Sequence, residues 1–147
     1  MARQIYDGFS LKLPDGWSDA VDDATFSDTG DLPPVRFSAT IGAGSLLVGA
    51  HVVHPDEPAC EGEAELEELA RDWGRRRGQP APLAWATKAR PDGAIATAIY
   101  RLAEDFVQLW YLSNGRTLVH ASYVCPWERR EEEALARDAI ATSLRFA

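Results

Sequence analysis

Residues that build disulfide frameworks and metal centres are scarce in this sequence. Of its 147 residues, 3 are histidine and 2 are cysteine, Cys60 and Cys125. The cysteines lie far apart and outside any CxxC pair, which excludes a disulfide-rich scaffold. In a chain that is not exported we expect both to be free thiols, whereas export would allow them to bridge.

Long hydrophobic runs are also absent. The longest apolar region, 41–53, is interrupted by glycines and polar residues, so no stretch approaches the roughly 20 apolar residues of a membrane helix. The first residues, Met-Ala-Arg-Gln-Ile-Tyr-Asp-Gly, lack the apolar core of a signal peptide. We therefore expect a cytoplasmic protein that does not insert into a membrane.

Basic charge is in short supply. The chain has 23 acidic and 15 basic residues, a formal net charge of −8. Such a balance excludes nucleic acid as a partner, because phosphates require a basic surface. The length and the hydrophobic content of 46% are those of one globular domain, which we expect to span residues 1–147.

Alternation of apolar and polar residues predicts most of the chain to be β-strand. The turn signals Pro14-Asp15-Gly16, Gly42-Ala-Gly44 and Pro91-Asp92-Gly93 separate these stretches. The expected strands are 9–13, a weak one at 25–27, then 35–41, 46–53, 83–88, 94–102, 105–112 and 117–124.

Asn114-Gly115 predicts a hairpin between the last two of these strands. A two-residue loop there would pair Ser113 with Arg116 and Tyr111 with Leu118. Both faces of this hairpin are then apolar and aromatic, which favours a central position in the sheet.

Two helices are expected. From Glu61, the spacing of Leu66, Leu69, Ala70 and Trp73 forms one apolar stripe, with glutamates at the start and arginines at the end, as the helix dipole favours. The second helix is expected to open at Pro126. Its predicted inner face is Leu135, Ala136, Ala139, Ile140, Ser143 and Leu144. The fold class is therefore α+β, an antiparallel sheet of about 6–8 strands with both helices packed on one side.

The histidines do not form a recognisable catalytic or metal site. His51 and His54 are three apart on a strand and point to opposite faces, so they and Cys60 cannot share a metal. His120 and Ser122 share a face but lie too far apart for a nucleophile and its base. We expect a protein that is not an enzyme and that holds no metal or cofactor.

Gly42-Ala-Gly44 begins like a dinucleotide-binding fingerprint, but position 47 is Leu47 where a third glycine is needed. The apolar residues after this segment have the pattern of a strand and not of a helix. We interpret the segment as a hairpin turn.

Three segments together resemble the PsbP-like superfamily, and within it the DcrB-related bacterial proteins. They are Phe9-Ser-Leu-Lys-Leu-Pro-Asp-Gly-Trp17, the glutamate-rich middle helix, and a closing pattern. The closing pattern is Leu109-Trp-Tyr-Leu, Ala121-Ser-Tyr-Val-Cys-Pro and Ala141-Thr-Ser-Leu-Arg-Phe146.

The resemblance covers nearly the whole chain and implies a non-enzymatic role. Members of the superfamily include photosystem subunits, nuclear transport adaptors, chaperones of type VI secretion effectors, and immunity-type proteins encoded beside toxins. No functional residue can be transferred from them.

The aromatic residues provide the candidate binding surface. Sheet faces that mix Trp, Tyr and His are typical of protein-binding surfaces, so we expect an exposed patch for a protein partner such as a secreted effector or toxin. The candidate residues are Trp85, Phe106, Gln108, Trp110, Tyr111, His120 and Tyr123. The alternative is a small-molecule-binding domain that uses a pocket between sheet and helices, with His120 or Tyr111 as a polar group.

Overall fold

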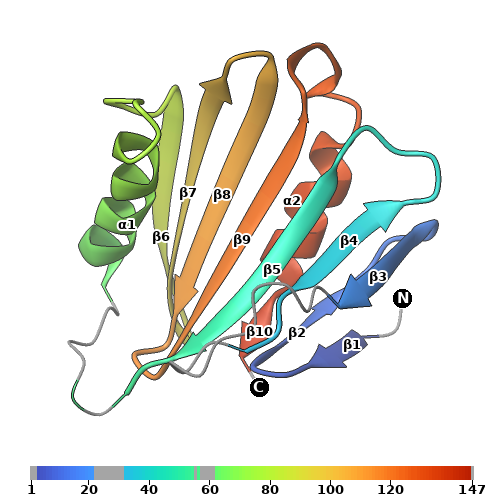
Figure 1. Cartoon of the computed structure of the whole chain (residues 1–147). Coiled ribbons are helices and arrows are strands. Elements are labelled where there is room, and N and C mark those ends of the chain that lie inside the picture. Colours follow the sequence, from blue (N-terminus) through green and yellow to red (C-terminus); the bar gives the residue numbers. More distant parts are fainter. Residues whose placement is uncertain (1–2, 22–31, 55, 57–61, 147) are drawn as a thin grey trace.

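The computed structural model describes residues 3–21, 32–54, 56 and 62–146, which form two helices and ten strands (Figure 1). The helices are α1 (Glu63–Arg75) and α2 (Ala134–Ser143). The strands are β1 (Arg3–Tyr6), β2 (Phe9–Lys12), β3 (Trp17–Val21), β4 (Val35–Ala39), β5 (Ser45–Val52), β6 (Ala84–Arg90), β7 (Gly93–Leu102), β8 (Asp105–Ser113), β9 (Thr117–Pro126) and β10 (Arg145–Phe146).

The strands form two antiparallel sheets. The large one has seven strands in the order β3-β4-β5-β9-β8-β7-β6, and the small one has three in the order β1-β2-β10. The four long strands β5, β9, β8 and β7 are neighbours at the centre, as expected for strands that are apolar on both faces. The α+β class and the antiparallel sheet are therefore confirmed.

The two helices lie on opposite faces of the large sheet. On β8, Trp110 and Leu112 belong to a core that includes Ile140 of α2 and Phe9 of the small sheet. The intervening Leu109 and Tyr111 belong to a second core under Leu66 of α1. Because successive side chains of a strand point to opposite faces, α1 and α2 cover opposite sides, and the expectation that both pack on one side is wrong.

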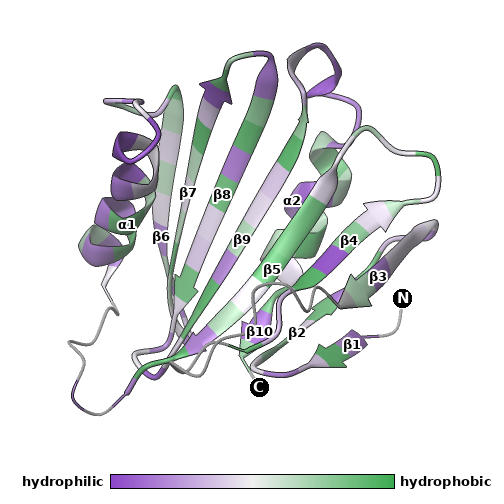
Figure 2. Ribbon diagram, in the orientation of Figure 1, coloured by the Kyte–Doolittle hydropathy of each residue, from purple (hydrophilic) through white to green (hydrophobic). Residues whose placement is uncertain are grey.

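Helix α1 forms where the sequence predicts it. Its hydrophilic side is turned away from the sheet (Figure 2), and Arg71 donates to Glu67 at 3.0 Å along that surface. Gly74 lies inside the helix because the ring of Tyr100 occupies the space of a side chain: a Cβ there would lie 2.4 Å from that ring. The Tyr100 hydroxyl donates to the carbonyl of Ala70 at 2.9 Å, which fastens the helix to β7.

Helix α2 differs from the prediction in its start and in part of its inner face. Strand β9 continues through Pro126, which pairs with Asp105, and a short 3-10 turn (Trp127–Arg129) precedes the helix. Leu135 is 89% exposed, whereas Arg137 is buried beside Ile140. Ile140 and Leu144 are buried as predicted, whereas Leu135 and Ala139 are exposed, because the charged Arg137 takes an inward position of the helix.

Three strands and one register were not predicted correctly. In β1 (Arg-Gln-Ile-Tyr) and β3 (Trp-Ser-Asp-Ala-Val) apolar and polar residues do not alternate, and β10 has only two residues. Residues 25–27 lie outside the described residues. In the hairpin, Tyr111 pairs with His120 and Ser113 with Leu118, two residues from the expected register. The Asn114 side chain accepts from the backbone of Arg116 and Thr117, which widens the loop. A shift of two preserves the face of every side chain.

Within the part of the chain that the structure describes, no helix is long and apolar enough to cross a membrane.

Candidate functional site

Among the described residues, no helix covers one half of the α1 side of the large sheet. Helix α1 packs on β6, β7 and β8, while the same side of β9 and β5 faces outward (Figure 1). Tyr111 of β8 packs under α1, and His120 of β9 is paired with it, so the side chain of His120 points to the α1 side of the sheet. Alternate residues of β9, and the residues of β5 that pair with them, therefore point to the same side. We call this surface the open face. It consists of Ser45, Leu47, Gly49 and His51 of β5 and Leu118, His120, Ser122 and Val124 of β9.

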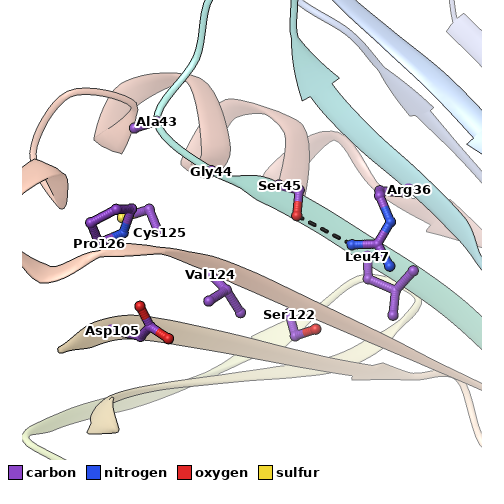
Figure 3. A pocket seen from close by; sticks show the side chains of 10 residues that line it. All are labelled: Arg36, Ala43, Gly44, Ser45, Leu47, Asp105, Ser122, Val124, Cys125 and Pro126. Carbon is purple, nitrogen blue, oxygen red and sulfur yellow. Dashed lines mark hydrogen bonds between the residues drawn. The ribbon is translucent and has the colours of Figure 1, made fainter. Parts of the chain in front are cut away.

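A hollow of about 440 Å³ occupies one end of the open face, where Leu47, Ser122 and Val124 line it. Figure 3 shows Arg36 of β4 at its rim, and the guanidinium donates to the Ser45 hydroxyl at 3.3 Å. Asp105 of β8 lies at the other side. This end therefore offers an apolar floor between one basic and one acidic group.

Gly44 shapes the same end of the face. A Cβ at this position would lie 2.1 Å from the carbonyl oxygen of Val124, so only glycine allows β5 to start this close to β9. The segment Gly42-Ala-Gly44 is thus a turn between β4 and β5, as the sequence predicts.

A second hollow of about 310 Å³ occupies the other end. It lies over Gly49, where the missing side chain leaves space between Pro34 and the ring of His120. His120 stacks on Tyr111 with ring centroids 4.4 Å apart and planes 2° from parallel. The Nε2 atom of His120 is buried and has no hydrogen-bond partner among the described residues.

Burial keeps both stacked rings neutral near pH 7. It lowers the pKa of His120 from its ordinary 6.5 to about 4, with a smaller contribution from the positive charge of Arg77. It also raises the pKa of Tyr111 to about 12. His51 lines the same hollow, whereas His54 accepts a hydrogen bond from the backbone of Asp56 at 3.2 Å.

Several residues predicted to contact a partner are instead in the core. Phe106, Trp110 and Tyr123 are buried on the α2 side of the sheet, so they do not form the exposed patch expected of them. Gln108 is buried on the same side. All four side chains are buried for the same reason: α2 covers this face of the hairpin.

Three of the predicted residues lie on the α1 side. Tyr111 is buried beside His120 at the edge of the open face. Trp85 is half exposed at the far edge of the sheet, where the guanidinium of Arg71 lies 5.1 Å from its ring. The structure therefore does not bring the predicted residues together into one surface.

A buried polar network under α2 escaped the sequence interpretation. Oε1 of Glu133 accepts from the Tyr123 hydroxyl at 2.7 Å and from the backbone of Ala43 and Gly44 at 3.1 and 2.9 Å. This carboxylate ties the turn between β4 and β5 to β9 and to the start of α2. Its fit to the two backbone N–H groups arises only in the folded chain, so no sequence pattern reveals it.

Arg137 extends this network one helical turn further. Its Nε donates to the Gln108 side chain at 2.9 Å, and Gln108 donates to the hydroxyl of Thr97 at 3.1 Å. The guanidinium also lies 4.6 Å from the ring centre of Phe106, an attractive cation–π distance. Gln108 and Phe106 thus serve to hold α2 on the sheet.

The comparisons with known proteins show a fold. Neither a family model nor a curated protein matches the sequence. The solution structure of cyanobacterial PsbP (CyanoP) from Synechocystis sp. PCC 6803 aligns with a TM-score of 0.70 at 16% identity, over 99% of this chain and 92% of that one. A crystal structure from Bacteroides thetaiotaomicron VPI-5482 aligns with a TM-score of 0.59 at 14% identity, over 95% of this chain and 45% of the other. The chain therefore has the PsbP-like fold.

Proposed function

We propose that this chain is a non-catalytic module that binds another protein, and that the partner lies on the open face. The observation that carries the proposal is the half of the sheet between α1 and β4, which no helix in the described ranges covers. On the opposite side, α2 and the small sheet cover the same strands. A central pair of strands left open on one side is typical of a binding surface.

The size of the open face suits a segment of polypeptide. Strand β5 has 8 residues, which gives a track roughly 26 Å long at about 3.3 Å per residue. Leu47, Leu118 and Val124 supply apolar contacts along it, and Val124 is 39% exposed. Serine and arginine at one end can accept or donate hydrogen bonds, which would fix the orientation of the partner.

The charge of the chain favours a neutral or basic partner. Its formal net charge of −8 attracts positive surfaces and repels acidic ones. An extended or helical segment would match the apolar residues of the open face with its own apolar side chains. Lysines or arginines on either side of that segment would be attracted by the negative charge of the chain.

The titratable groups at the face suit binding better than catalysis. General acid–base catalysis works best with a pKa near the working pH. His120, with a pKa of about 4, and Tyr111, with a pKa of about 12, both lie far from neutrality. Burial also raises the pKa of the Cys125 thiol, which keeps it protonated.

Several more specific roles would each require a surface that binds a polypeptide. Kinship with the DcrB-related proteins, a cytoplasmic location, and a role as a secretion-associated chaperone, adaptor or immunity protein belong to the proposal. That the chain forms one domain over residues 1–147 stays a prediction. The identity of the partner would separate the three roles, because an effector, a transport factor and a toxin differ in sequence and activity.

Capture of a partner by matched variants tests the proposal. The tagged chain and two variants, Val124→Lys on the open face and Leu135→Lys on the far side of α2, are incubated with lysate of the source cells. Leu135 is 89% exposed, so its replacement controls for added charge. A partner retained by the wild type and by Leu135→Lys but lost by Val124→Lys is the expected result. A partner held equally by all three would contradict the proposed location.

A second candidate function rests on the unpartnered Nε2 of His120. A small molecule in the hollow over Gly49 that reached this nitrogen would supply the missing hydrogen bond. A compound that raises the melting temperature of the wild type, but not that of His120→Phe, would support small-molecule binding. Equal shifts in both proteins would place the compound elsewhere.

A further inference from the structure

Strand β6 is the outermost strand of the large sheet beside α1. It pairs with β7 along its whole length, from Ala84 opposite Ile99 to Arg90 opposite Gly93. In an antiparallel ladder, alternate residues direct their backbone groups away from the partner strand. The outer edge of β6 therefore offers a row of backbone donors and acceptors, and Pro82 and Pro91 bound this row at its two ends.

This edge is only partly protected against pairing, because Lys88 is the one charged side chain of β6 that is exposed. Natural edge strands carry charges, prolines or bulges. Here residues 83–87 hold no charged side chain, and the apolar Leu83 and Trp85 are 63% and 50% exposed. The charge of Arg90 does not protect the end of the strand against pairing, since its guanidinium donates to the carbonyl of Leu144 at 2.8 Å and pairs with Asp92 at 3.2 Å.

The charges of α1 are arranged so that two copies of the helix complement each other. The first half of the helix holds Glu63, Glu65, Glu67 and Glu68, while Arg71, Arg75 and the adjacent Arg76 and Arg77 lie toward its end. Within one helix Glu67 pairs with Arg71 and Glu68 with Arg75. When two such helices run antiparallel, the acidic half of one also lies beside the basic half of the other, which favours their association.

A single two-fold rotation would bring together both the outer edges of two β6 strands and the charged surfaces of two α1 helices. A two-fold axis through the outer edge of β6, normal to the sheet, places a second β6 antiparallel to the first. The same axis sets the two α1 helices antiparallel on one face. Helix α1 lies over β7, so with strands about 4.8 Å apart the two helices would be about 14 Å apart. Long glutamate and arginine side chains can bridge that separation.

In this arrangement Trp85 would lie in the space between the two helices. It lies on the α1 side of the sheet, since it pairs with Ala98, and the guanidinium of Arg71 lies over its ring. Two copies of Trp85 would meet at the seam under both helices and remove their exposed surface from water.

We propose that two copies of this chain associate edge to edge through β6, forming one continuous sheet with a pair of antiparallel α1 helices along the seam. A second copy is the occupant that the charges favour: each copy carries −8 overall, yet the α1 pair brings opposite charges together. The proposal is independent of the binding role of the open face, which lies on β5 and β9 beyond the far side of α1.

Sedimentation velocity over micromolar to near-millimolar concentrations tests this association. We expect a dimer whose dissociation constant rises about tenfold or more in Ala86→Lys, which sets a lysine at the seam of each copy. Charge reversal on the helix surface, Glu67→Lys with Glu68→Lys, is expected to weaken the dimer similarly, and high salt to weaken the wild type. Ile5→Lys, on the exposed β1, is the control and should dimerise like the wild type.

Two results would overturn the proposal. One is a wild-type chain that stays monomeric over the whole range. The other is a dimer of unchanged affinity in both Ala86→Lys and the double glutamate variant. Thermal melting of each variant, followed by circular dichroism, distinguishes a weaker dimer from an unfolded chain.

Discussion

The imidazole of His120 lies face to face with the phenol ring of Tyr111, with centroids 4.4 Å apart and planes 2° from parallel. The two residues are directly opposite on β9 and β8, where paired side chains are closest. The stack forms the wall where the covered half of the sheet meets the open face. It is also the element of the site that responds most directly to pH.

Acid is expected to destabilise the protein through His120. The pKa of this group is about 4 in the folded chain and about 6.5 in the unfolded chain. Between these values the unfolded chain binds a proton that the folded chain does not, so stability falls as the pH drops through this window. From pH 7 to 4.5 the loss in the free energy of unfolding would be about 2 kcal/mol.

Urea unfolding at both pH values measures this loss. His120→Phe keeps an aromatic stack without the titration, so it should lose less stability than the wild type over the same interval. His54→Gln, at an exposed position, serves as the matched control. An identical loss in the wild type and in His120→Phe would rule out this origin.

Gly74→Ala is expected to destabilise the chain although alanine is the better helix former. Alanine gains roughly 1 kcal/mol of helix propensity over glycine. Its Cβ would however lie 2.4 Å from the ring of Tyr100. The ring must then shift, which strains the hydrogen bond from the Tyr100 hydroxyl to the carbonyl of Ala70. Overpacking of this kind costs about 1–3 kcal/mol, so the net effect is a loss.

Thermal unfolding of Gly74→Ala in two backgrounds checks the cause. When Tyr100 is replaced by leucine, the clash disappears and the same substitution should become neutral or stabilising. A loss of equal size in both backgrounds would show that the ring contact is not responsible.

Removing the Glu133 carboxylate is expected to loosen α2 and the turn between β4 and β5. Glu133→Ala leaves the Tyr123 hydroxyl and the backbone N–H groups of Ala43 and Gly44 without their acceptor. Each unsatisfied buried group costs about 1–3 kcal/mol, so we expect a loss of about 3 kcal/mol. Glu133→Gln retains an acceptor oxygen and should lose less. Denaturant midpoints at a constant m-value give both numbers, and equal stability of the two variants would contradict this role.

Local sequence patterns predicted the elements whose inward residues are apolar. The stripe through Leu66 and Trp73 and the segregated charges predicted α1 correctly. In the hairpin, the period of two predicted which residues share a face, although the loop geometry at Asn114 moved the register by two. For α2 the sequence predicted the burial of Ile140 and Leu144 but not that of Arg137, whose guanidinium points inward and donates to Gln108 of β8.

The site was less accessible to sequence reasoning than the fold. Trp110 and Tyr111 are equally aromatic neighbours, yet one is covered by the core under α2 and the other borders the open face. Which half of a sheet a helix covers depends on tertiary packing and not on local pattern. The signal that could have indicated the open face is Gly49, a glycine within an apolar strand, which often marks a close approach or a hollow.

Amide chemical-shift mapping of the complex with a captured partner tests the central claim most directly. The account predicts that the largest changes fall on β5 and β9, around Leu47, Gly49, His120 and Val124, while α2 around Leu135 is unaffected. Changes confined to α2 or to the small sheet, with β5 and β9 unperturbed, would contradict binding at the open face.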